Sequence, residues 1–121
     1  MVTAGPTPEV QGPPYCARLL QAACVEELAA LFDGQPKRSL AITDEGVDIQ
    51  RDNDIRAGWA ARAVIAYGKH LGSGELTEDL TTVIGDLIGD LLHLLDAVEV
   101  EWDDVRERAE RFHGQEVTGD L

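Results

Sequence analysis

The chain has 121 residues, 44% of them hydrophobic, and a formal net charge of −13. This length and composition suit one globular domain with a modest core and exclude wholesale disorder. No 18-residue stretch is apolar and free of charge, and the first ten residues lack the basic start and apolar run of a secretion signal, so we expect a cytoplasmic protein without a membrane span. Cys16 and Cys24 would lie about 12 Å apart on a helix, too far for a disulfide, and we expect both to be reduced.

The negative charge is concentrated in the second half of the chain. Residues 72–121 hold 14 acidic and 3 basic residues, which accounts for −11 of the −13, and no Lys or Arg lies between Gly72 and Val105. Phosphate contacts need cations, so direct binding of this half to nucleic acid or to an anionic membrane is disfavoured. A basic protein partner, divalent cations, or simple solubility remain open explanations.

The first 32 residues divide into a proline-rich segment and a predicted helix. Residues 1–14 hold four of the five prolines and predict a flexible leader. Residues Tyr15 to Phe32 are rich in Ala and Leu at helical spacing, and Gly34 with Pro36 predicts the end of this helix. Cys24 falls on its apolar stripe, which favours a role as core filler over that of a nucleophile.

The pattern then changes period between Ser39 and Arg51. Apolar and polar residues alternate on either side of Asp44-Glu45-Gly46, which is typical of a short β-hairpin with the glycine at the turn. Two strands alone are marginally stable, so an irregular loop is an equally good interpretation.

A second helix is predicted over Ile55 to His70, with Asn53 or Asp54 as its N-cap and Gly72 at its end. Helical spacing assigns its inner face to Ile55, Trp59, Ala63, Ala66 and Tyr67.

The longest predicted helix runs from Thr77 to Val98, with a wide apolar arc and an acidic back. We expect the arc to be buried and the back to face water. Gly85 and Gly89 lie beside the arc, and glycine in a helix costs about 1 kcal/mol relative to alanine, so a packing reason is expected. The small residues Gly58 and Ala61 of the preceding helix suggest that the two small surfaces meet, within one chain or between two.

A last helix is predicted over Asp104 to His113, with Asp103 as its cap and Trp102 as a hydrophobic staple before it. Gly114 is expected to end it, and residues 117–121 to fray. Its buried stripe is predicted to be Trp102, Val105, Ala109 and Phe112.

The predicted fold is therefore mainly α: a small four-helix domain over residues 15–116, with one hairpin between the first two helices as an option. Wide apolar helix faces on so short a chain exceed what four helices can cover, which predicts a symmetric homodimer.

Two candidate sites share the long helix. Its acidic face, a potential binding surface, comprises Asp79, Asp86, Asp90, His93 and Asp96. An alternative is a Mg²⁺ site formed by Glu75, Glu78, Asp86 and Asp90, because carboxylates are the ligands that Mg²⁺ prefers. A solvated acidic face is the simpler interpretation. The sequence contains no Gly-rich phosphate loop, CxxC, HExxH or G-x-S-x-G motif, so we predict no catalytic residues.

The segment from Asp86 to Asp96 (DLIGDLLHLLD), followed by Trp102 to His113 (WDDVRERAERFH), resembles small helical proteins of unknown function from bacteriophages and actinobacteria. The same helices resemble, more distantly, the C-terminal half of MazG-type all-α nucleotide pyrophosphatases, which hold Mg²⁺ and the triphosphate with an ExxE and an ExxD motif. Glu75-Leu-Thr-Glu78 matches the first motif. The second fails, because Val83 and Leu87 stand three residues before Asp86 and Asp90.

The leading hypothesis is a non-enzymatic acidic binding or regulatory protein, phage- or prophage-derived, that engages a basic protein partner without a cofactor. A divergent Mg²⁺-dependent nucleotide pyrophosphatase and a structural homo-oligomer are the alternatives.

Overall fold

The computed structural model describes residues 19–38, 40 and 48–119. It confirms a mainly helical fold, and its described part contains five helices rather than the predicted four, and no strand. The helices are α1 (Val25–Phe32), α2 (Ile49–Leu71), α3 (Ser73–Thr77), α4 (Leu80–Val98) and α5 (Trp102–Thr118).

Helix α1 begins at Val25, later than predicted. The described residues before it, 19–24, are not helical. The Glu27 carboxylate accepts a hydrogen bond from the Ala23 backbone N–H at 2.9 Å and so satisfies a donor next to the helix start. The Ala23 carbonyl accepts from the Leu80 N–H, which joins this non-helical segment to the start of α4.

Helix α2 starts at Ile49, six residues before the predicted start. The N-cap is Asp48, whose carboxylate accepts from the Arg51 N–H at 3.0 Å, so the predicted caps Asn53 and Asp54 lie inside the helix. Residues 49–51 of the proposed hairpin are therefore helical. Most of the remaining hairpin, residues 39 and 41–47, lies outside the described part of the chain.

The segment predicted as one helix from Thr77 is divided at Glu78 and Asp79. The Asp79 carboxylate accepts from the Thr82 N–H at 2.8 Å and caps α4, so Asp79 is a capping residue and not a member of a helical acidic face. From Leu80 to Val98 the helix passes through Gly85 and Gly89 without interruption.

Helix α5 is longer than predicted at both ends. It begins at Trp102, which is its first residue and not a staple before the cap, and it continues through Gly114 to Thr118. Gly119 ends it with a φ of 81°, a left-handed conformation that glycine adopts at low cost. The stripe predicted to be buried is exposed: Trp102, Val105 and Phe112 keep more than a third of their surface.

The core lies where α1, α2 and the first turns of α4 meet. Its buried members are Val25, Leu28, Ala61, Val64 and Val83. The inner face of α2 is thus rotated relative to the prediction, because Ile55 is buried as expected whereas Trp59, Ala63 and Ala66 are exposed.

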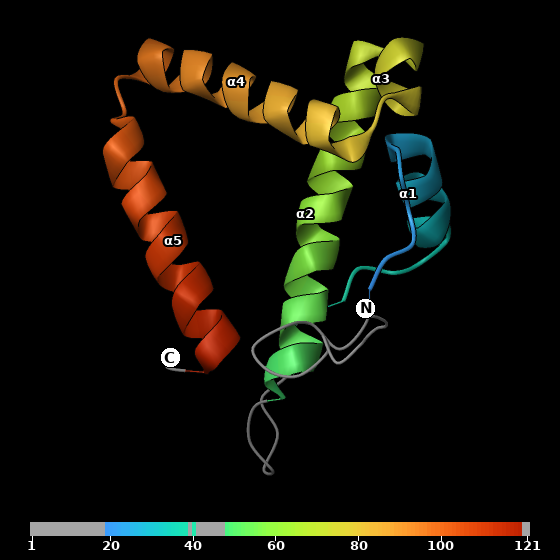
Figure 1. The fold of residues 1–121 in the computed structure, drawn as a ribbon, viewed down its shortest axis with the longest axis horizontal. Coiled ribbons are helices and arrows are strands. Elements are labelled where there is room, and N and C mark those ends of the chain that lie inside the picture. Colours follow the sequence, from blue (N-terminus) through green and yellow to red (C-terminus); the bar gives the residue numbers. More distant parts are fainter. Residues whose placement is uncertain (1–18, 39, 41–47, 120–121) are drawn as a thin grey trace, which may run out of the picture.

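The helices form an open arrangement (Figure 1). Helix α2 is central, α1 and α3 lie against it, α4 leads away from its end, and α5 returns toward its beginning. There the Arg56 guanidinium forms an ion pair with Glu116 at 3.2 Å, and the Asn53 amide donates to the Glu116 carbonyl at 3.3 Å. Across the described residues, none of the helices has the length and apolar character needed to span a bilayer.

Candidate functional site

Acidic side chains gather where α2, α3 and α4 meet. The Tyr67 hydroxyl of α2 donates a hydrogen bond of 2.7 Å to the Asp90 carboxylate of α4. This bond, with burial and the negative charges of Asp90, Asp86 and Glu75, raises the pKa of Tyr67 to about 12. Tyr67 therefore keeps its proton over the whole physiological range and holds Asp90 beside α2.

Glu75 of α3 lies at the centre of this group. Its side chain is half-buried, and Oε2 is shielded from solvent without a hydrogen-bond partner. Burial raises the pKa of the Glu75 carboxyl, and the charges of Asp86 and Glu78 raise it further, with smaller contributions from a side-chain hydrogen bond with Asp86 and from the charge of Asp90. We name Glu75, Glu78, Asp86 and Asp90 the carboxylate cluster.

Of the four residues proposed as an alternative Mg²⁺ site, Glu78, Asp86 and Asp90 lie near enough to Glu75 for their charges to raise its pKa. The sequence predicted that Asp86 and Asp90 would lie on a side of α4 that faces only water. Instead, Asp90 accepts a hydrogen bond from Tyr67 of α2, and the charges of both residues raise the pKa of Glu75 of α3. His93 and Asp96 lie further along α4 and are exposed. No group of three or more His, Cys, Asp or Glu side chains in the described part of the chain has the geometry of a metal site.

Sequence reasoning missed Tyr67 as a member of this site and assigned it to the core. A signal was available, because a tyrosine on a packed helix face generally needs a hydrogen-bond partner for its hydroxyl. Asp90 is that partner.

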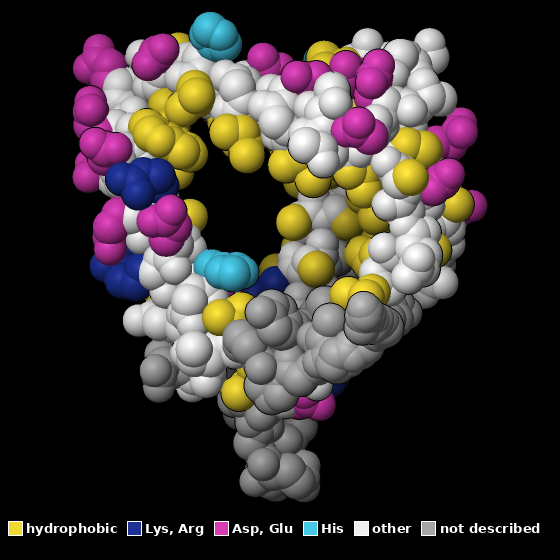
Figure 2. Space-filling model, in the orientation of Figure 1, with side chains coloured by type: hydrophobic (Ala, Val, Ile, Leu, Met, Phe, Trp, Pro, Cys, Tyr) yellow, Lys and Arg dark blue, Asp and Glu magenta, His cyan; other side chains and the backbone are white. Residues whose placement is uncertain are grey.

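A second feature is an extended exposed apolar surface on α4 and α5. Its large hydrophobic side chains each keep between 36% and 54% of their surface, although the sequence predicted burial of the α4 arc. We name it the α4–α5 apolar face; it comprises Ile84, Ile88, Leu91, Leu92, Leu94, Val98, Val100, Trp102, Val105 and Phe112. Figure 2 shows hydrophobic atoms along the rim of an open space between α2, α4 and α5, with acidic side chains on the outer side.

The two predicted small-residue surfaces do not meet within the chain. A Cβ on Gly58 would lie 3.3 Å from the Phe32 ring, and Ala61 is part of the core. Gly85 and Gly89 face open space, because a Cβ added to either would meet no atom within 4 Å. The alternative that these glycines pack against a second chain stays a prediction.

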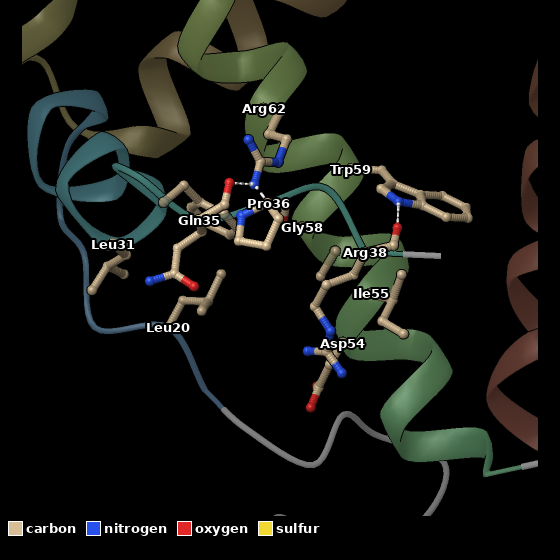
Figure 3. A pocket seen from close by; sticks show the side chains of 12 residues that line it. Leu20, Leu31, Gln35, Pro36, Arg38, Asp54, Ile55, Gly58, Trp59 and Arg62 are labelled. Atoms are coloured by element: carbon tan, nitrogen blue, oxygen red, sulfur yellow. Dashed lines mark hydrogen bonds between the residues drawn. The ribbon is translucent and has the colours of Figure 1, made fainter. Parts of the chain in front are cut away.

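A cavity of about 250 Å³ lies between α1, α2 and the segment that follows α1. Figure 3 shows two of its polar side chains engaged with backbone carbonyls: the Trp59 indole donates to the Arg38 carbonyl at 2.8 Å, and the Arg62 guanidinium donates to the Gln35 carbonyl at 2.9 Å. Arg62 also lies 5.4 Å from the centre of the Phe32 ring. These two side chains hold the segment that follows α1 on α2.

Comparison with protein-family models, with curated proteins and with solved structures finds no match to this chain. The resemblances seen in the sequence therefore stay predictions, and the functional argument depends on the two surfaces described here.

Proposed function

We propose that the protein is a non-enzymatic acidic binding protein whose carboxylate cluster receives a cationic side chain of a basic protein partner. The observation that supports this most directly is the crowding of negative charge around Glu75, whose carboxyl is partly buried beside the carboxylates of Asp86 and Glu78. The negative charges of three further carboxylates raise the pKa of Glu75, and the chain has no Lys or Arg between Gly72 and Val105 to balance these charges. A Lys or Arg from a partner would supply the positive charge that this group lacks and would donate to the exposed carboxylates of Asp86 and Asp90.

The cytoplasm is the proposed compartment, and a homodimer is the proposed form of the protein. Both proposals extend the sequence predictions. The carboxylate cluster lies at the joint of α2, α3 and α4, whereas the exposed apolar side chains extend along α4 and α5, so one chain could bind a basic partner and a second copy at different surfaces.

Calorimetric titration of the protein with a Lys- and Arg-rich decapeptide tests the binding proposal. We expect saturable binding that weakens as salt is added, because exposed charges are screened within about 10 Å at 0.1 M salt. The double variant Asp86→Asn/Asp90→Asn should raise the dissociation constant at least about tenfold.

The matched control is Asp96→Asn/Asp103→Asn, which removes the same charge at exposed positions outside the cluster. Equal weakening in both double variants would mean that net charge alone attracts the peptide. No binding at low salt would reject the proposal outright.

The second candidate is a Mg²⁺-dependent nucleotide hydrolase, which extends the sequence prediction for Glu75, Glu78, Asp86 and Asp90, although the described residues contain no group with the geometry of a metal site. In that case these four carboxylates would hold Mg²⁺, which would supply positive charge to stabilise a triphosphate. Incubation with a panel of nucleoside triphosphates and Mg²⁺ decides the matter: turnover that disappears in Asp86→Asn would replace the binding proposal with an enzymatic one.

A further inference from the structure

The α4–α5 apolar face has little support from its own chain. Helix α4 contacts α2 through its first turns, where Val83 joins the core, and α5 is attached to α2 mainly near Glu116. A helix in a protein owes most of its stability to the packing of its apolar face. The second half of α4, where Leu94 and Val98 keep 52% and 54% of their surface, lacks that packing.

The amount of exposed surface matches a specific interface. Ten large side chains at 36–54% exposure present on the order of 800 Å² of surface, which is about what one partner contributes to a standard protein–protein interface. Single exposed hydrophobic residues are common on monomers, but a contiguous apolar patch of this size marks a binding site.

The chemistry of the face suits a second copy of the same chain. Along α4 its members are aliphatic, and helical spacing places Asp86, Asp90 and Asp96 on other sides of that helix, so the α4 stripes of two copies can meet without burying like charges. A basic partner would find no carboxylate within this stripe to pair with. Figure 2 shows further hydrophobic atoms on the α2 side of the same open space.

We propose that two copies of the chain pair through their α4–α5 apolar faces, so that each copy fills the open space between α2, α4 and α5 of the other. This pairing is independent of the carboxylate cluster. It assigns a second copy of the chain as the occupant of the face.

Sedimentation equilibrium over a range of protein concentrations tests the pairing. The unmodified protein should be a dimer at about 10 µM, and Leu91→Glu, which places a charge in the face, should be monomeric there, a rise in dissociation constant of at least about 100-fold. Leu71→Glu is the matched control: Leu71 is 48% exposed, Leu91 is 42% exposed, and only Leu91 belongs to the face.

A monomeric unmodified protein at about 100 µM, or equal dissociation of both glutamate variants, would overturn the proposal. If circular dichroism shows that Leu91→Glu has lost helix, Leu91→Ala replaces it. That truncation adds no charge and should still raise the dissociation constant about tenfold. An unchanged constant would also overturn the pairing.

Salt separates this proposal from the peptide-binding one. Each copy carries −13, so added salt should tighten the dimer by screening repulsion, whereas it should weaken the complex with a basic peptide. A dimer that weakens steadily with salt would contradict an apolar interface, and failure of peptide binding would leave the dimer result intact.

Discussion

The two halves of the structure use similar amphipathic helices with opposite results. In the body, formed by α1, α2 and α3, apolar side chains converge with Val83 of α4 into a buried core. In the arm, formed by the rest of α4 and α5, side chains of the same kinds are exposed. Amphipathic periodicity thus shows that a helix has a face to cover, but not whether its own chain covers it.

The largest expected difference between the halves comes from truncating a leucine in each. Leu28→Ala removes a side chain that is 5% exposed in the core and should lower the free energy of unfolding by about 2–5 kcal/mol. Leu94→Ala acts on a side chain that is 52% exposed and should cost the monomer less than about 1 kcal/mol.

Urea unfolding at protein concentrations low enough to keep the chain monomeric measures both values. The paired form should respond differently, because Leu94 would then be covered. Equal losses in the monomer would mean that the arm packs on its own chain as firmly as the body does.

The sequence predicted the helical class, the central parts of three helices and the last part of the first, because period and composition are local properties. The helix ends were harder to predict, because several residues could serve as caps: Asp48 caps α2, although Asn53 and Asp54 also fit the pattern of an N-cap. Asp79 interrupts a segment whose apolar spacing continues through it.

Which face of a helix is covered was harder still to predict. The small side chains on α2 are so numerous that burial of Ala61 and exposure of Ala63 could not be inferred from spacing. The membership of the carboxylate cluster could be proposed, since its residues lie close in sequence. Its contact with Tyr67 could not, because it depends on how α4 leaves the body.

Two glycine-to-alanine substitutions sharpen the comparison, because the same added methyl group should have opposite effects. At Gly68 the new Cβ would lie 3.0 Å from Val25 Cγ1 and 3.2 Å from Cγ2, and Val25 is fully buried and cannot move away freely. We expect Gly68→Ala to lower the free energy of unfolding by about 1–3 kcal/mol.

Gly85→Ala should instead raise the stability of the monomer by up to about 1 kcal/mol, since its Cβ meets nothing within 4 Å and alanine favours the helix. Thermal unfolding of dilute protein measures both changes. If Gly85→Ala were as damaging as Gly68→Ala under those conditions, the arm would already be closely packed in the single chain.

The smallest expected effect concerns Glu75, at the joint between the body and the arm. Because the pKa of its carboxyl is raised in the folded protein above the ordinary value of 4.5, the folded state binds the proton more tightly than the unfolded state does. The stability that the protonated carboxyl contributes is complete below pH 4.5 and is lost as the pH rises through the folded-state pKa. Glu75→Gln, which stays neutral, should therefore melt at a higher temperature than the unmodified protein at about pH 7.5, and the difference should shrink toward about pH 4.

The control variant is Glu26→Gln, on the exposed first turn of α1, which makes the same charge change away from the cluster. If its melting temperature follows the same pH dependence, the effect arises from the overall charge of −13 and not from the carboxylates crowded at the joint.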